Sequence, residues 1–314
     1  MKKHFKFQPL KSWWGGLKHL FEKFTFFNKF KDRIKRIFEP SGRGTCSLQQ
    51  PTDFLGFPKD SQQSPTIKIL VAYHKPAPLI QNDIYTPIHV GRMICQLPSK
   101  DGELSQNDLK WLTSNMIGDN TGDHISHLNR YFCELTAHYW AWKNYNTLGN
   151  PEYIGFSHYR RVLPYDFSNL NDDTDIYTLC IKWNGSTNGK SCEQHDILEH
   201  IVYNFQTTQP DMYRIGQAYL ASDRGYYCNM FVMKKELFFD FCKWIFPILM
   251  QNGNFEPRGV GYIAERLTGI WITYQKQQGK IIKELWKIDI KNTNESLKEL
   301  SEHHIPFIPL DSMS

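Results

Sequence analysis

Two adjacent arginines follow a short apolar run near the middle of the chain. Residues 153–156 have the composition of a buried strand, and His158, Tyr159, Arg160 and Arg161 follow almost at once. In open α/β sheets, ligands bind beyond the carboxyl ends of the strands. A guanidinium group suits phosphate because its planar fork donates two parallel charged hydrogen bonds. The pattern predicts a phosphate-binding site, with two solvated arginines at a strand end as the alternative.

Polar residues in two earlier loops are candidates for the same site. Residues 67–72 are expected to form the first strand, so Tyr73 and His74 begin the loop that commonly meets a nucleotide in an α/β domain. Asp119 and Asp123 lie in a loop rich in Asn and Gly. Their carboxylates are expected to contact ribose, sugar or a metal ion, or only to shape the turn.

No group of residues has the spacing of a known metal site. Glu134 and His138 share one face of a predicted helix but lack a nearby third ligand, so a bridge to a neighbouring element is favoured. The acidic residues 172–175 fit either a cation site or a helix cap. Seven cysteines without a CxxC pair indicate reduced thiols in a cytosol. We assign no metal ligands and leave Mg²⁺ or Mn²⁺ open as a cofactor.

Strand and helix patterns alternate along the part of the chain that carries these candidates. This alternation predicts one nucleotide-binding α/β domain with a mixed, mostly parallel sheet. The chain has no GxGxxG after its first strand, no GxxxxGK[ST] and no GxSxG, which argues against dinucleotide, P-loop and α/β-hydrolase sites. The expected strands include residues 67–72, 153–156, 176–181 and 230–233, and the expected helices residues 129–144, 194–205, 213–221, 235–249 and 258–274.

Positive charge is concentrated near the amino terminus. The net charge is +5, and residues 1–44 contain twelve Lys or Arg against three Asp or Glu, interleaved with Phe and Trp. This basic amphipathic segment is expected to be helical and to bind an anionic membrane surface, with packing on the domain as the alternative. Nothing else in the chain supports a nucleic-acid partner. The expected division is this segment, a linker at 45–66, a catalytic domain at 67–291 and a tail at 292–314.

Several longer motifs occur in an order that resembles a known family. They are ILVAYHK at 69–75, GDNTGDHIS at 118–126, CELT at 133–136, YWAWKN at 139–144, YIGFSHYRR at 153–161, CNMFVMKKEL at 228–237 and GYIAERL at 261–267. Together they resemble the bacterial capsular and exopolysaccharide biosynthesis glycosyltransferases, long labelled a domain of unknown function. Some members of that family resemble galactofuranosyltransferases that use UDP-galactofuranose. The resemblance covers roughly residues 67–286.

The resemblance implies a fold related to the GT-A glycosyltransferases and a UDP-sugar donor. It also implies a lipid-linked glycan acceptor at the cytoplasmic face of the cell membrane. Such folds usually hold a metal ion on the diphosphate with an Asp-x-Asp motif, whereas the comparable strand end here carries residues 158–161. Two guanidinium groups are able to neutralise the charge that grows on the leaving UDP, as the metal otherwise would.

The resemblance further implies an acceptor side that contains a general base. Glu265 is the expected base that takes the proton from the attacking hydroxyl, and Asp223 is the second choice. The structural alternative for Glu265 is an ion pair with Arg266 or Arg258.

The remaining candidates receive supporting roles. His195 and Asn229 are assigned to the acceptor, with an ordinary helix-surface position as the alternative for His195. His158 is expected to contact the diphosphate or to orient the arginines, with a structural hydrogen bond as the alternative. The function expected is transfer of a sugar, with inversion, in capsule, exopolysaccharide or O-antigen synthesis. A non-catalytic nucleotide- or carbohydrate-binding partner of an assembly complex is the alternative.

Overall fold

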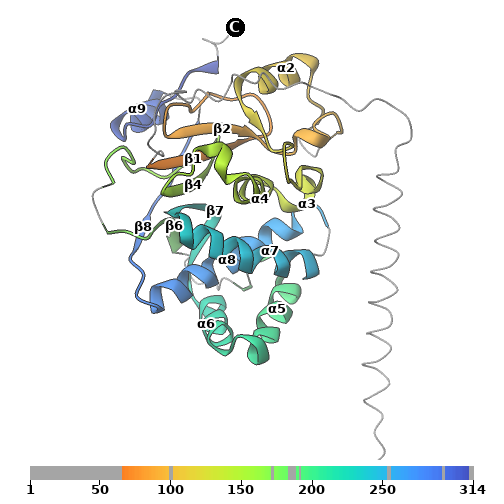
Figure 1. The fold of residues 1–314 in the computed structure, drawn as a ribbon, viewed down its shortest axis with the longest axis vertical. Helices are drawn as coiled ribbons and strands as arrows, with labels where there is room; N and C mark the ends of the chain where they lie inside the picture. The colour runs from red at the N-terminus through yellow and green to blue at the C-terminus, as the bar shows by residue number, and fades with distance from the viewer. Residues whose placement is uncertain are drawn as a thin grey trace, which may run out of the picture. The chain divides into compact units, whose positions relative to one another are not determined.

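In the computed structural model, the part of the chain that the structure describes folds around one nine-stranded sheet with helices on either side (Figure 1). The strand order along the sheet is β3-β2-β1-β4-β7-β6-β8, and β5 and β9 pair off this path. The predicted membrane segment at 1–44 and nearly all of the predicted linker lie outside the described residues. The structure describes residues 66–98, 102–170, 173–182, 189–190, 192–252, 256–291 and 294–310.

Four parallel strands form one half of the sheet. They are almost continuously buried, as expected for strands covered on both faces. In the register of β1 with β2 and β4, Tyr73 lies opposite His89 and Ala72 opposite His158, so the three carboxyl ends reach the same edge. The strands are β1 (Ile67–Tyr73), β2 (Tyr85–His89), β3 (Ile117–Gly118) and β4 (Tyr153–His158).

The other half of the sheet is mixed. β7 runs antiparallel to both β4 and β6, and β8 runs parallel to β6. The short strand β5 returns along β4 and pairs with β9. Along the main path, four of the six neighbouring pairs are parallel, which confirms the mixed, mostly parallel sheet. These strands are β5 (Arg161–Val162), β6 (Ile176–Lys182), β7 (Arg224–Lys234), β8 (Ile282–Leu285) and β9 (Ile288–Asp289).

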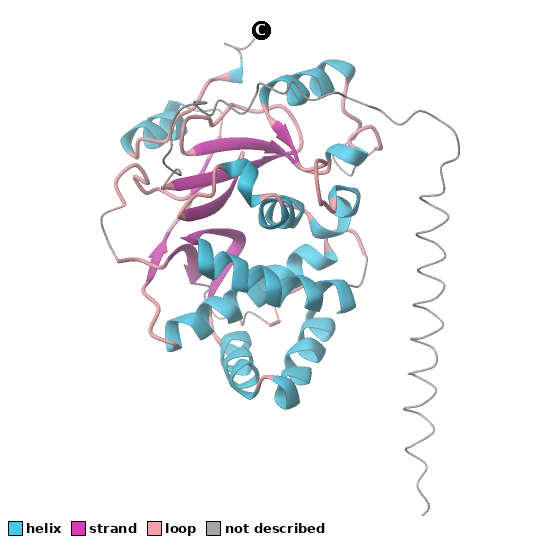
Figure 2. Cartoon of the chain, viewed as in Figure 1, coloured by secondary structure: helices cyan, strands magenta, loops and turns pink. Residues whose placement is uncertain are grey.

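Helices cover both faces of the sheet and enclose two hydrophobic cores (Figure 2). On one face α4, α7 and α8 pack against the strands, with α5 and α6 beyond them. On the other face α2 and α9 contribute Leu112 and Leu300, both fully buried. The helices are α2 (Gln106–Asn115), α3 (Asn129–Phe132), α4 (Leu135–Lys143), α5 (His195–Thr208), α6 (Pro210–Ala221), α7 (Lys235–Asn252), α8 (Gly259–Gln277) and α9 (Asn294–Glu302), with short 3₁₀ turns η1 (Arg92–Ile94), η2 (Ser126–Leu128) and η3 (Tyr145–Leu148).

Glycines allow the helices behind α8 to pack closely. A Cβ on Gly269 of α8 would lie 1.9 Å from the hydroxyl of Tyr219 on α6. A Cβ on Gly216 of α6 would lie 2.8 Å from a methyl group of Val202 on α5. These contacts fix α8 firmly against the α5–α6 hairpin, and α8 is the helix that carries Glu265.

The segment that we set apart as a tail is partly folded onto the domain. It contains α9, and Ile308 forms a β-bridge with Leu79. The segment is polar overall, so its composition did not predict this packing. One apolar side is enough to anchor a short helix, and Leu300 on that side is fully buried. Among the described residues, no helix is long and apolar enough to cross a membrane.

Candidate functional site

The carboxyl ends of β1 and β4 bring together four of the residues predicted to meet the nucleotide. Their parallel register places Tyr73 beside Tyr159, and the two rings stack with centroids 5.5 Å apart. The edge of the His74 ring meets Tyr159 at 5.3 Å, and the exposed Arg160 guanidinium lies 5.1 Å from the same ring. The result is an aromatic and cationic cluster at the edge where ligands of α/β sheets bind.

Tyr73 supports this cluster from inside the protein. Its side chain is fully buried, and its hydroxyl donates to the Pro78 carbonyl oxygen and accepts from the Ile80 amide, both at 2.9 Å. Burial raises the pKa of the Tyr73 phenol well above its ordinary value. The structure therefore gives Tyr73 the role of a ring platform and of an anchor for the loop after β1.

Asp119 is also fully buried, and its carboxylate holds a neighbouring turn. It accepts hydrogen bonds from the amides of Gly91 and Arg92 at 2.8 and 3.1 Å and from the Ser126 hydroxyl at 2.5 Å. Burial raises the pKa of this carboxyl. A Cβ on Gly91 would lie 2.6 Å from Asn129, and its φ of 69° also favours glycine. Asp119 thus shapes the loop after β2.

Strand β7 is irregular opposite β4. Cys228 and Asn229 have φ values of 65° and 48°, and the β6–β7 register shifts between Thr178 and Cys180. We call Cys228 and Asn229 the β7 bulge. Left-handed backbone at two successive non-glycine residues costs about 1–3 kcal/mol each and persists only where surrounding contacts hold it. Backbone strain and β-bulges are concentrated at functional sites, so the residues that hold the bulge are candidates for the site.

His158 and Arg161 both contact the β7 bulge. The Nε2 atom of His158 lies 2.8 Å from the Cys228 carbonyl oxygen, and because a carbonyl only accepts, this nitrogen carries the proton. Arg161 lies 3.8 Å from the Cys228 sulfur and 3.4 Å from a carboxylate oxygen of Asp289. Its side chain is 39% exposed. Arg160 and Arg161 therefore have different neighbours, the first on the β1 side of the site and the second on the β7 side.

Glu265, the predicted base, also contacts the bulge. One of its oxygens accepts from the Cys228 amide, and the other lies 2.5 Å from a guanidinium nitrogen of Arg266. The Arg266 guanidinium lies 4.6 Å from the ring of the buried Tyr227. Burial raises the pKa of Glu265, whereas the Arg266 charge opposes that rise. The ion pair that we considered as the structural alternative is present, and it also fixes where the carboxylate points.

Glu134 is a second carboxylate at this place. Its Oε1 atom accepts from the side-chain amide of Asn229 at 2.7 Å, and its charge adds to the rise in the Glu265 pKa. Asn229 is 3% exposed and also accepts from the Thr268 hydroxyl at 3.3 Å. Cys133, just before Glu134, has a φ of 52°. Glu134 thus bridges the start of α4 to the bulge, as we expected of a helix-to-neighbour contact.

The connection from β8 to β9 passes close to Arg161. β8 ends at the same sheet edge as β4, and β9 pairs Asp289 with Arg161. We call Trp286 and Lys287, which join the two strands, the strap. Lys287 pairs with Asp289, and its charge also acts on the Cys228 thiol. Trp286 is 57% exposed and its ring centroid lies 6.0 Å from that of His303, so the strap carries a largely exposed indole.

Asp123 and Asp223 lie apart from Glu265 in the described contacts. Asp123 is exposed and accepts from the Tyr139 hydroxyl at 3.2 Å, with Lys143 at 3.9 Å. Asp223 pairs with Lys182 at 3.8 Å before β7 begins. Four residues of extended chain separate Asp223 from the bulge, so it remains only a remote alternative to Glu265.

His195 begins α5 and forms contacts within its own helix. Its two ring nitrogens lie 3.5 Å from Asp196 and 3.3 Å from Glu199. These are the contacts of a helix surface, the alternative that we held open for this residue.

Metal binding has little support from the side chains in the described part of the chain. Those residues contain no group of three or more His, Cys, Asp or Glu side chains arranged to hold a metal ion. His138 is fully buried between the rings of Phe156 and Phe231, and burial lowers its pKa to about 3. Glu134 therefore hydrogen-bonds Asn229, whereas His138 is part of the core. Asp172, in the predicted acidic cluster, lies outside the described residues.

Sequence reasoning missed the bulge and the residues that depend on it. For Glu134 a bridge to a neighbouring element was favoured without naming its partner Asn229, and Cys228 was given no role in the site. Arg266 was noted only as an ion-pair partner of Glu265, and Trp286, which lies in the loop between β8 and β9, was assigned no role. The one available signal was CN at 228–229, because Asn favours left-handed backbone more than most residues do.

The architecture defines a GT-A-like domain, because a sheet of this kind also occurs in a solved glycosyltransferase. The structure of WbbM, a bifunctional glycosyltransferase in its apo form, matches with a TM-score of 0.58 and 28% identity. The match covers 72% of this chain and 46% of WbbM, so this chain spans about half the length of that protein. A search of curated proteins found no match.

The family model of a domain of unknown function, DUF4422, matches residues 68–180 and 182–277. The chain belongs to this family, and the matched residues include every part of the site described above except the strap and β9.

Proposed function

We propose that this protein is a glycosyltransferase that transfers a sugar from a UDP-sugar with inversion. One arrangement carries the proposal: a cationic sheet edge and a partly buried carboxylate both contact the β7 bulge. Arg161 contacts the Cys228 side chain, and Glu265 accepts from the Cys228 amide. Glycosyl transfer from a nucleotide diphosphate needs both groups, a cation for the leaving group and a base for the attacking hydroxyl.

The proposed reaction is a single displacement. The acceptor hydroxyl oxygen bonds to the anomeric carbon as the bond from that carbon to the β-phosphate oxygen breaks. The proton of the hydroxyl passes to Glu265, and the electron pair leaves with UDP. Arg161 faces the bulge and therefore stabilises the leaving phosphate, whereas Arg160, His74 and Tyr159 bind the nucleotide side of the donor. This division follows from the different neighbours of the two arginines.

The donor sugar and the pathway rest on the family resemblance. Galactofuranose is the proposed donor sugar, and a lipid-linked glycan of capsule, exopolysaccharide or O-antigen synthesis is the proposed acceptor. The test is an assay of purified protein with a panel of UDP-sugars and glycan acceptors, with and without EDTA. Acceptor-dependent UDP release supports the proposal, and equal release with EDTA indicates that the arginines act without a metal. An absence of release with every pair would favour the non-catalytic binding partner instead.

The open indole of the strap is positioned to bind the acceptor. A sugar ring presents a face of C–H groups that packs on an aromatic surface, and Trp286 offers such a surface three residues before Asp289, the β9 partner of Arg161. Trp286→Ala is expected to raise the acceptor KM roughly two- to tenfold, from about 0.5–1.5 kcal/mol of ring contact. Trp286→Phe serves as the matched control and should retain most of the binding. Steady-state kinetics at saturating donor check this, and an unchanged acceptor KM in the alanine variant would contradict it.

A membrane-bound acceptor gives the basic amino-terminal segment a role. Residues 1–44 are proposed to hold the enzyme on the anionic inner face of the cell membrane, where the lipid-linked glycan lies. A chain lacking these residues is expected to move from the membrane to the soluble fraction and to sediment less with anionic vesicles. High salt should release the full chain as well, because the attraction is screened. Unchanged partitioning of the shortened chain would contradict this role.

A further inference from the structure

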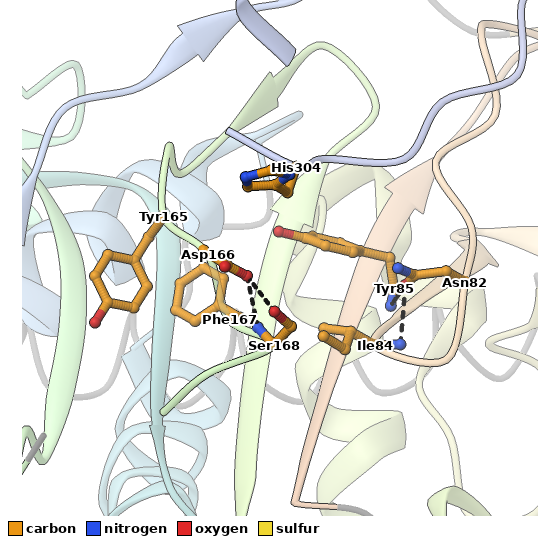
Figure 3. A pocket seen from close by; sticks show the side chains of 8 residues that line it. All are labelled: Asn82, Ile84, Tyr85, Tyr165, Asp166, Phe167, Ser168 and His304. Atoms are coloured by element: carbon orange, nitrogen blue, oxygen red, sulfur yellow. Dashed lines mark hydrogen bonds between the residues drawn. The ribbon is translucent and has the colours of Figure 1, made fainter. Parts of the chain in front are cut away.

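A hollow of about 410 Å³ lies away from the arginine site (Figure 3). Asn82 and Tyr85 lie on one side of it, and Asp166 and Phe167 on the other, with His304 above the gap. Tyr85 begins β2 and pairs with Ile69 near the start of β1, so the hollow lies toward the amino ends of these strands. It is therefore distinct from the carboxyl edge where Arg160 and Arg161 lie.

The walls of the hollow are aromatic and held in place. Tyr165, which also lines it, packs on Phe167 with ring centroids 5.0 Å apart and on the buried Tyr177 at 4.9 Å. Lys283 lies 4.4 Å from the Tyr165 ring and 3.2 Å from its hydroxyl. Tyr85 and Phe167 are 4% and 3% exposed, so the accessible aromatic surface of the hollow is mainly that of Tyr165 and His304. These contacts fix the ring surfaces before any ligand binds, which lowers the entropic cost of binding.

Two polar side chains at the rim of the hollow, Asn82 and Asp166, have groups that can hydrogen-bond a ligand. The side-chain oxygen of Asn82 accepts from the amides of Ile84 and Tyr85. These two hydrogen bonds do not use its NH₂ group, which is a donor. One oxygen of Asp166 accepts from the amide and the hydroxyl of Ser168, and the second oxygen is a further acceptor. These hydrogen bonds lower the pKa of Asp166, so the carboxylate is charged at neutral pH.

We propose that this hollow binds one neutral sugar residue of a glycan. Sugar recognition combines aromatic surfaces, which pack on C–H groups, with planar amide and carboxylate groups, which bind hydroxyls. The volume lies within the range of small-molecule sites. A phosphate or an acidic sugar fits poorly, because none of the lining residues is Lys or Arg and Asp166 would repel it. The inference concerns binding only and stands whether or not the chain transfers sugars.

The test measures binding of methyl glycosides to the full chain by saturation-transfer NMR, with the α- and β-forms of galactopyranose, galactofuranose, glucose and mannose as probes. Asp166→Asn keeps an oxygen for Ser168 but removes the charge, and it is expected to raise Kd roughly tenfold for any glycoside that binds. His304→Gly removes a lining ring at a φ of 55°, a conformation that suits glycine, so it should reduce binding without loss of folding.

Lys298→Ala, on an exposed part of α9, is the matched control and should bind as the natural chain does. Arg161→Ala separates this site from the proposed transfer site, and binding in the hollow should persist in it. Binding that survives both Asp166→Asn and His304→Gly would overturn the proposal. So would the absence of binding by every glycoside at millimolar concentration.

Discussion

Replacement of Glu265 with glutamine is expected to lower the rate of transfer by about 10²–10⁴-fold, the usual contribution of a general base. Glutamine keeps one oxygen, which can accept from the Cys228 amide or from Arg266 but not from both, and it cannot accept the proton. UDP binding should change little, because the arginines are intact. The measurements are single-turnover rates and UDP affinity by calorimetry, with thermal unfolding to confirm that the variant folds.

The pH dependence of the transfer rate is an independent test of Glu265 as the base. Burial raises the pKa of Glu265, so a larger fraction of it is protonated in mildly acidic solution than an exposed glutamate would be. A base acts only when deprotonated, so the rate should rise with pH through this raised pKa and level off above it. The rising limb is therefore expected at a higher pH than the ordinary value of 4.5 for a glutamate.

A matched control for Glu265 is Glu284→Gln. Glu284 also lies in a charged network, with Arg224 and Lys276, but on β8 away from the bulge. Its replacement should leave the rate and the pH profile nearly unchanged. Full transfer by the Glu265→Gln variant, or an identical loss in both variants, would remove Glu265 from the role of base.

The two arginines are expected to differ in kinetic effect although they are adjacent in sequence. Arg161→Ala should lower kcat about 10²–10³-fold, as removal of one group that stabilises developing charge commonly does. Arg160→Ala should mainly raise the donor KM and the Kd of UDP, by roughly 10- to 100-fold for lost charged hydrogen bonds of about 1.5–3 kcal/mol. The reason is that Arg161 contacts Cys228, whose amide Glu265 binds, whereas Arg160 lies over Tyr159.

Arg214→Ala provides the control for loss of positive charge. Arg214 pairs with Asp211 on the exposed side of α6, so its removal should affect neither constant. The Arg161→Lys variant separates the effect of charge from that of geometry, because lysine keeps the positive charge but lacks the planar guanidinium. Equal effects of the Arg160 and Arg161 substitutions on kcat would contradict the division of roles between them.

The sequence predicted β1 and β4 of the parallel half of the sheet, because both are short, apolar and followed by polar residues, whereas β2 and β3 were not among the predicted strands. The stacking of Tyr73 on Tyr159 follows from that prediction, since parallel neighbours end at the same edge. The Glu265 helix was likewise predicted from the apolar periodicity of α8. These features depend on local patterns and were accessible without the fold.

The β7 bulge was not predictable in the same way. Left-handed backbone at Cys228 depends on Glu265, which binds its amide, and on His158, which binds its carbonyl, and both are distant in sequence. Asp119 is the opposite case, because it was expected to contact a ligand and is fully buried. An Asp in a turn-rich loop looks available to a ligand, but backbone amides surround its carboxylate. Burial of a polar group is set by tertiary contacts that a local pattern does not contain.

A crystal structure of the protein with UDP tests the central claim most directly. The account predicts that the diphosphate lies at the carboxyl edge of β1 and β4, with Arg161 on the β-phosphate and Arg160 on the nucleotide side. Glu265 should face the β-phosphate across the β7 bulge, with room between them for a sugar. UDP bound elsewhere, or bound with both guanidinium groups turned from its phosphates, would contradict the account.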